Sequence, residues 1–107
     1  MGQTRVAGRR YPWPVEGNRV ELDRSNGDVV VVVLTGEHDV YTAPKLRDRI
    51  NSVIAERSPF IVDLTHATFV DSSVLRVLLE ARRQAEEAGL GFAVAASPLR
   101  RRRGLHG

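Results

Sequence analysis

The run DVVVVVL, from Asp28 to Leu34, decides how this chain folds. Five consecutive valines leave no polar face, which is typical of a strand buried on both sides of a sheet. Upstream, residues 19–24 alternate apolar and charged side chains, the period of a strand with one wet face. The dipeptide Asn26-Gly27 between the two segments tolerates the positive φ angles of a two-residue turn. The sequence therefore predicts an antiparallel hairpin at the start of the domain.

Downstream of the valines, apolar residues follow a helical period in two stretches and a strand-like pattern in two others. Thr42 stands at the N-cap position of the first helix, Pro44 stands in its first turn, and Gly89 stands where the second helix ends. The predicted elements are, in order, a helix over 43–57, a strand over 59–64, a helix over 71–88 and a strand over 90–96. Strands joined through helices of this length run parallel through right-handed crossovers. The order β-β-α-β-α-β therefore predicts an α/β fold with a mixed, mostly parallel sheet and helices packed against it.

The 107 residues fit a single domain with basic ends. Residues 1–18 combine glycine, arginine and a Tyr-Pro-Trp-Pro run, which predicts an N-terminal extension. The folded domain is expected over 19–98, and an arginine-rich tail over 99–107. The pI near 10.2 comes from these ends, because residues 19–96 carry nine basic and twelve acidic side chains, a net charge of −3. Direct binding of nucleic acid by the folded part is therefore not expected.

Neither a membrane protein nor a disulfide scaffold is expected. The chain has no cysteine, which excludes disulfides, thiolate metal ligands and a cysteine nucleophile. No apolar run approaches the roughly 20 residues that span a bilayer. The N-terminal residues also lack the apolar stretch of a secretory signal. We therefore expect a cytoplasmic protein with no membrane partner.

Two segments directly follow parallel strands, at the edge of an α/β sheet where ligands and partners bind. They span 35–42 and 65–73, and they bring Asp39 and Asp71 to one edge. Ser72 stands at the start of the second helix, where unpaired N–H groups and a partial charge of about +0.5 would receive a phosphate. A phosphate on Ser72 would add about −1.5 to −2 charges and would disturb an interface there. The simpler alternative is that Asp71 or Ser72 only caps the helix.

Four short stretches carry a family resemblance. They are Leu34 to Asp39 (LTGEHD), Thr42-Ala43, Ile61 to Leu64 (IVDL) and Phe69 to Ser73 (FVDSS). In this order they resemble the successive motifs of the STAS domain, which bacterial anti-sigma factor antagonists share with sulfate transporter tails. The resemblance runs from about Arg19 to Pro98. It implies a STAS-like fold and a binding protein, not an enzyme.

The resemblance also implies a phosphorylation switch. In the antagonists, the serine directly after the aspartate is phosphorylated by a protein kinase that is also the anti-sigma factor. Carried over, Ser72 is the phosphoacceptor, and the partner-binding rim around it is formed by Asp39, Thr42, Asp71, Ser73 and Val74. The unphosphorylated form would bind the anti-sigma factor and free the sigma factor for transcription. ATP would be bound by this partner, a phosphatase would reverse the step, and no cofactor is implied for this chain.

Two departures from the family pattern keep other functions open. Val74 stands where the family has glycine, and the run Arg100 to Arg103 replaces the leucine-rich residues of a further helix. This final helix is expected to be short or absent, which would leave apolar surface for a partner or for a homodimer. The alternative function is a phosphorylation-insensitive scaffold or adaptor subunit in a larger assembly. A third is a nucleic-acid accessory protein that acts through the arginine tail.

Catalysis and metal binding are not predicted. A hydrolase triad would have to draw on Ser72, on His38 or His66, and on Asp39 or Asp63. No G-x-S-x-G nucleophile elbow accompanies these residues. The three histidines share no metal-ligand spacing with one another or with carboxylates. Gly36 stands alone, outside any glycine-rich phosphate loop.

Overall fold

A computed structural model describes residues 18–96, and its elements follow the predicted order β-β-α-β-α-β. The elements are β2 (Asn18–Asn26), β3 (Val29–His38), α1 (Ala43–Ala55), β4 (Phe60–Val70), α2 (Ser72–Ala88) and β5 (Phe92–Ala95). The arginine-rich tail, the short or absent final helix and all but the last residue of the N-terminal extension lie outside the described residues. No helix in the described range is long and apolar enough to cross a membrane.

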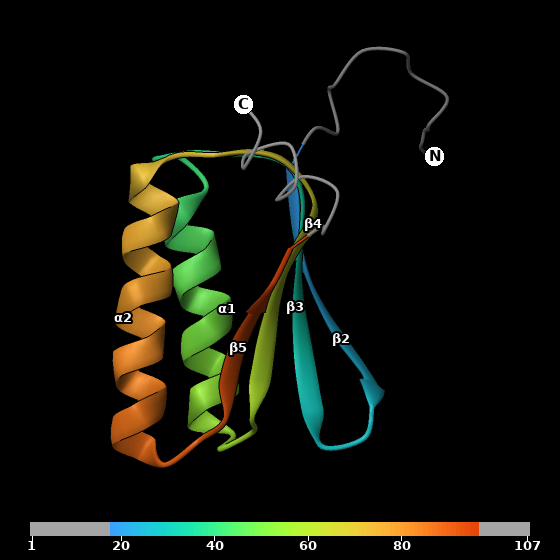
Figure 1. Cartoon of the computed structure of the whole chain (residues 1–107), viewed down its shortest axis with the longest axis vertical. Helices are drawn as coiled ribbons and strands as arrows, with labels where there is room; N and C mark the ends of the chain where they lie inside the picture. The colour runs from blue at the N-terminus through green and yellow to red at the C-terminus, as the bar shows by residue number, and fades with distance from the viewer. Residues whose placement is uncertain (1–17, 97–107) are drawn as a thin grey trace, which may run out of the picture.

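The four strands form one mixed sheet in the order β2-β3-β4-β5. β2 runs antiparallel to β3, whereas the β3–β4 and β4–β5 pairs are parallel. Both helices stand side by side on the same face of this sheet (Figure 1). The α/β class and the mostly parallel sheet are therefore confirmed.

The valine strand is buried on one face only, which corrects the prediction that both of its faces are covered. Val30, Val32 and Leu34 point towards the helices and are at most 3% exposed. The alternate residues Val31 and Val33 are only half-buried. Since α1 and α2 pack on the same face, nothing among residues 18–96 forms a second layer over the other face.

The core lies between the sheet and the two helices. Phe60 and Val62 of β4 belong to the same buried cluster as the inward stripe of α1, which includes Leu46, Ile50 and Val53. The inward stripe of α2 consists of Val74, Val77, Leu78, Ala81 and Ala85. The predicted aliphatic core is therefore present, with Phe60 as its largest fully buried side chain.

The strands β3 and β4 both continue well beyond their predicted ends, as far as the loops that precede α1 and α2. β3 continues through Gly36 to His38, and β4 continues from Leu64 to Val70. Their register shifts twice, so that β4 accommodates two more residues than β3 between the pairs Val30–Phe60 and His38–Val70. In β4 the shifts interrupt the alternation of inward and outward residues, since Ala67 is buried five residues after Val62. β3 keeps its period as far as the buried His38, but Gly36 and polar residues replace the valines there.

The turns and caps partly follow the prediction. The hairpin turn consists of Gly27 and Asp28, one residue later than predicted. Gly27 has φ 68° and Asp28 has no positive φ, a pattern that fits a type II′ turn and not the type I′ turn typical of Asn-Gly. α2 ends as predicted at Gly89, whose φ of 72° is left-handed. Thr42 occupies the N-cap position of α1, but its side chain makes no capping bond there.

Candidate functional site: the rim at the ends of β3 and β4

The two segments that the sequence places at one edge of the sheet lie side by side. His38, the last residue of β3, is paired in register with Val70, the last residue of β4. The backbone N–H of Asp71 donates to the carbonyl oxygen of His38 across 3.2 Å. The loop from β3 to α1 and the connection from β4 to α2 therefore cross the same end of the molecule, at the top of Figure 1. We call this end the rim and define it by residues 38–43 and 69–73.

Asp71 holds the start of α2. It is the N-cap residue, in an extended conformation, and its Oδ1 accepts hydrogen bonds from the backbone N–H groups of Ser73 (2.9 Å) and Val74 (3.2 Å). These bonds satisfy two of the donors that a helix leaves unpaired at its start. Capping by Asp71, which the sequence offers as the simpler explanation, is therefore present. It does not involve Ser72.

Ser72 is the first residue of α2, and its side chain is exposed to solvent. Ser73, the next residue, is half-buried, as are Asp71 and Asp39. A hydroxyl at this place is accessible to a protein that approaches the rim from above. Its neighbour Asp71 brings a carboxylate that is already hydrogen-bonded to the helix backbone.

Val74 is not part of the rim, which corrects the set of partner-binding residues. Its side chain is 0% exposed and packs in the core with Val77 and Leu78, because it lies on the inward stripe of α2. The Val74 side chain, which stands where the family pattern has glycine, therefore points towards the sheet. It does not stand between Ser72 and solvent.

Asp39 organises the other half of the rim. Its carboxylate oxygen Oδ1 accepts from the N–H of Tyr41 at 2.9 Å. Its carbonyl oxygen accepts from the N–H groups of Thr42 (3.1 Å) and Ala43 (2.9 Å). Its own N–H donates to the Thr42 hydroxyl, also at 2.9 Å. The turn is thus closed by Asp39 and Thr42 together, and Thr42 is a structural member of the rim with an engaged hydroxyl.

His38 lies beneath this turn with a ring that is almost fully buried, at 1% exposure. Its Nε2 is 2.9 Å from the carbonyl oxygen of Thr35, and its Nδ1 is 3.1 Å from the Thr42 hydroxyl. A carbonyl oxygen can only accept, so Nε2 carries a proton and donates to Thr35. Sequence analysis lists His38 only among candidates for catalysis or metal binding. Its burial identifies it as a satisfied core histidine.

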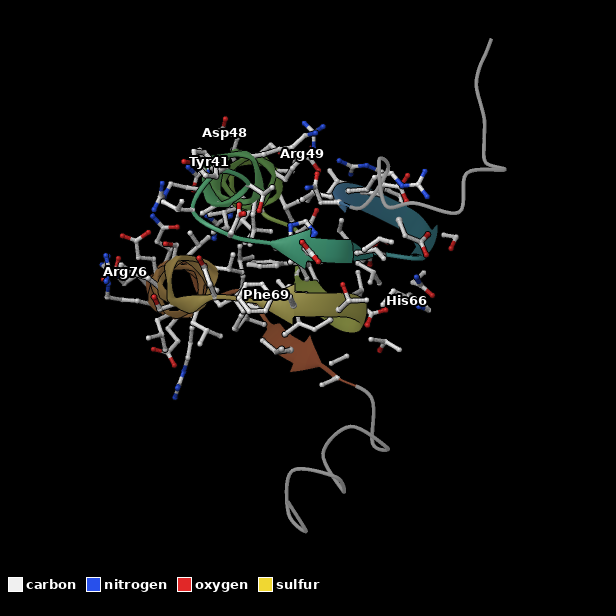
Figure 2. All side chains as sticks on the ribbon, turned by 90° about the horizontal axis from the view of Figure 1, so that it is seen from above. Tyr41, Asp48, Arg49, His66, Phe69 and Arg76 are labelled. Carbon is white, nitrogen blue, oxygen red and sulfur yellow. The ribbon has the colours of Figure 1, made fainter. Side chains whose placement is uncertain are left out.

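Both halves of the rim carry exposed apolar side chains. Val40 is 55% exposed, Tyr41 88% and Phe69 53%. Viewed onto the rim, Tyr41 lies over α1, and Phe69 lies at the end of β4 beside the start of α2 (Figure 2). Leu75 and Leu79 add 50% and 66% exposed side chains on the first turns of α2. Sequence analysis missed this feature. The apolar residues next to each acidic motif are its only signal.

The candidate triad is not assembled. Both ring nitrogens of His38 are occupied within the β3–α1 turn, and His66 is an exposed residue of β4. No hydrogen bond in the described part of the chain joins Ser72 to a histidine. Within the same range, no three His, Asp or Glu side chains are grouped closely enough to hold a metal ion.

Two surface hollows lie away from the rim. One, of about 780 Å³, lies between β2 and α1 and is lined in part by Leu22, Val33 and Arg49. The other, of about 370 Å³, lies at the opposite end, beside the β2–β3 turn and Ser58-Pro59. The rim residues line neither of these two hollows.

Comparison with known proteins assigns the fold to a family. A model of the STAS domain matches residues 20–104. An anti-sigma factor antagonist from Mycobacterium paratuberculosis superposes with a TM-score of 0.68 at 29% identity, covering 86% of this chain and 78% of that one. The Bacillus cell fate determinant SpoIIAA in its phosphorylated form gives 0.63 at 25% identity, with 78% of each chain covered. Unphosphorylated SpoIIAA, also an anti-sigma factor antagonist, shares the fold at 24% identity and a TM-score of 0.64, covering 83% of this chain and 84% of that one.

Proposed function

This chain belongs to the STAS domain family, and we propose that it is an anti-sigma factor antagonist switched by phosphorylation of Ser72. In its unphosphorylated form it binds, through the rim, an anti-sigma factor that has serine kinase activity. This binding releases a sigma factor for transcription in the bacterial cytoplasm. The partner binds ATP and transfers a phosphate to Ser72, and a phosphatase restores the binding form.

The observation that carries this proposal is the exposure of Ser72 at the start of α2, directly after Asp71. At about pH 7, a phosphoserine brings about −1.5 to −2 charges. The start of a helix offers a partial charge of only about +0.5, and Asp71 already engages two of the N–H groups there. The modified rim would therefore carry a surplus of negative charge, with Asp39 on the neighbouring turn. A partner that fits the uncharged hydroxyl would have to desolvate this charge, which weakens docking.

The exposed apolar side chains of the rim support a protein partner. Tyr41 and Phe69 are large and exposed; Tyr41 lies in the turn closed by Asp39, and Phe69 lies near the end of β4, paired with Glu37 of β3. Aromatic residues of this kind dominate the energetics of many protein interfaces. We expect them to supply affinity, while the charge state of Ser72 decides whether the interface forms.

The direct test is phosphorylation in vitro. The purified protein is incubated with ATP and each kinase-type anti-sigma factor of the same genome, and the products are mapped by mass spectrometry. We expect phosphate on Ser72 in the wild type, and none on Ser72→Ala or on Ser73 in either protein. Absence of phosphate on Ser72, under conditions that modify a control antagonist, contradicts the switch.

A binding test separates the switch from the scaffold function. Wild type and Ser72→Asp are compared as baits in a native lysate, with Asn51→Asp, an added carboxylate at an exposed position of α1 outside the rim, as the control that should still capture the partner. We expect the anti-sigma factor to be captured by the wild type and lost from Ser72→Asp. Equal capture by these two baits would favour a phosphorylation-insensitive scaffold or adaptor subunit.

A further inference from the structure

We propose that His38 is a positioning residue that sets the placement of the Asp39 turn relative to Ser72. This inference rests on the proposed function, because it assigns a role within the same rim. His38 is the only buried polar or charged side chain among residues 18–96. It lies at the end of β3, beneath the point where the two connections of the rim meet.

The side chain of His38 acts on the Asp39 turn. Its Nε2–H donates to the Thr35 carbonyl at 2.9 Å, which fixes the ring against its own strand. Its Nδ1 then lies 3.1 Å from the Thr42 hydroxyl, which also lies within donating distance of the Asp39 carbonyl oxygen. The Thr42 oxygen in turn accepts from the Asp39 N–H at 2.9 Å. A chain of hydrogen bonds therefore leads from β3 through the ring to the backbone of Asp39.

The arrangement of Thr42 indicates that this chain of bonds is specific. A threonine at an N-cap normally accepts from the backbone N–H groups of the first helical turn. Thr42 makes no such bond, although it stands at the N-cap of α1. Its hydroxyl is instead shared between the ring of His38 and the backbone of Asp39, whose carbonyl oxygen lies 3.2 Å away.

The main chain of His38 acts on the other half of the rim. Its carbonyl oxygen accepts from the N–H of Asp71 at 3.2 Å, directly before Ser72. One residue is thus bonded to the Asp39 turn through its ring and to the start of α2 through its backbone. An apolar side chain would fill the same space, but it would leave the Thr35 carbonyl and the Thr42 hydroxyl without this partner. The Asp39 turn would then no longer be hydrogen-bonded to the side chain of the residue whose carbonyl oxygen holds Asp71.

Amide hydrogen exchange of ¹⁵N-labelled protein tests the inference without any partner. We compare wild type, His38→Leu and His38→Asn, whose side-chain amide places an acceptor near the position of Nδ1. Leu34→Val is the control, because it changes the same strand in the core without touching these bonds. In His38→Leu, the exchange rates of the Asp39 and Asp71 amides should rise at least about tenfold relative to that of Val32. In His38→Asn, the Asp39 amide should return to within about threefold of wild type.

The control separates positioning from loss of stability. Leu34→Val should change the exchange of all three amides in the same proportion. If His38→Leu does the same, or if His38→Asn restores nothing, the inference is wrong. If His38→Leu does not fold, His38→Gln replaces it: its longer amide can still bond to the Thr35 carbonyl but not to the Thr42 hydroxyl, so exchange at Asp39 should accelerate relative to Val32, and unchanged exchange contradicts the inference. A two-dimensional ¹H–¹⁵N spectrum of the ring must also show that Nε2 carries a proton.

A second measurement connects the position to the switch. With the kinase found under the proposed function, His38→Leu should reduce the initial rate of Ser72 phosphorylation at least about tenfold, and His38→Asn should recover most of it. If Ser72 of His38→Leu is phosphorylated at the wild-type rate, His38 has no positioning role, although the phosphorylation of Ser72 itself is then confirmed. If no kinase modifies Ser72, the proposed function fails, while the exchange experiment still decides whether His38 positions the rim.

Discussion

The N–H of Asp71 donates to the carbonyl oxygen of His38 across 3.2 Å, and this bond joins the two connections that form the rim. It extends the parallel ladder of β3 and β4 by one bond beyond the last register pair. As a result, the carboxylate that caps α2 and the turn closed by Asp39 are fixed relative to each other by main-chain geometry. The exposed Ser72 is the next residue after Asp71.

The capping role of Asp71 can be separated from its charge. Asp71→Ala should lower the free energy of unfolding by about 1 kcal/mol, because it leaves the N–H groups of Ser73 and Val74 without their acceptor. Asp71→Asn keeps an acceptor oxygen and should stay within about 0.5 kcal/mol of wild type. Urea unfolding followed by circular dichroism measures both. A loss in Asp71→Asn as large as that in Asp71→Ala would show that the charge, and not the cap, stabilises α2.

Val74 should prove to be a core residue in solution. Val74→Gly removes a fully buried side chain and places glycine in a helix, so we expect a loss of about 3 kcal/mol in the free energy of unfolding. Arg76→Gly, at an exposed position two residues later, should lose only the helix-propensity contribution of about 1 kcal/mol. Thermal and urea unfolding compare the two. Equal losses would mean that Val74 is not packed as described.

The free energy of unfolding at acid pH should depend on Asp63. Hydrogen bonds from the side chain and backbone of Thr65 lower the pKa of the Asp63 carboxyl, against a smaller opposing effect of burial. Because the pKa in the folded state lies below the unfolded value of about 4, this carboxylate contributes stability that is fully present above about pH 4. The contribution is lost as the pH falls through the folded pKa.

Asp63→Asn should therefore flatten the decline of the unfolding free energy below about pH 4, with little effect on its slope near neutral pH. Urea midpoints measured from pH 7 down to about pH 2 give the profile. Asp48→Asn, an exposed carboxyl on α1, is the control. If the unfolding free energy falls equally steeply at acid pH in Asp63→Asn and in wild type, the lowered pKa of Asp63 is contradicted.

Tyr41 and Phe69 should matter for binding and not for folding. Both side chains are more than half exposed, so Tyr41→Ala and Phe69→Ala should change the unfolding free energy by no more than about 0.5 kcal/mol. Each should weaken binding to the anti-sigma factor by at least about tenfold, as measured by calorimetry. Asp48→Ala, whose side chain is exposed further along α1, serves as the matched control. Unchanged affinity in both aromatic variants would place the interface elsewhere.

The sequence by itself was sufficient for the architecture and for the candidate serine. Elements joined by helices of ordinary length leave few topologies open, and periodicity located every element from the hairpin to β5. The short FVDSS stretch placed Asp71 and Ser72 at a helix start, since aspartate is a strong N-cap. That Ser72 is a phosphoacceptor stays a prediction, as do the roles of Asp39, Thr42 and Ser73 in binding.

The tertiary structure decided which side chains are available at the rim. The valine strand kept a half-buried face because both helices pack on the other one. The helical period alone places Val74 on the inward stripe of α2, but only the packing shows that this removes it from the rim surface. The course of β4 beyond Asp63 depends on register shifts against β3, between residues distant in sequence. Local periodicity cannot encode such pairings, because each one is determined by contacts that exist only after the strands have met.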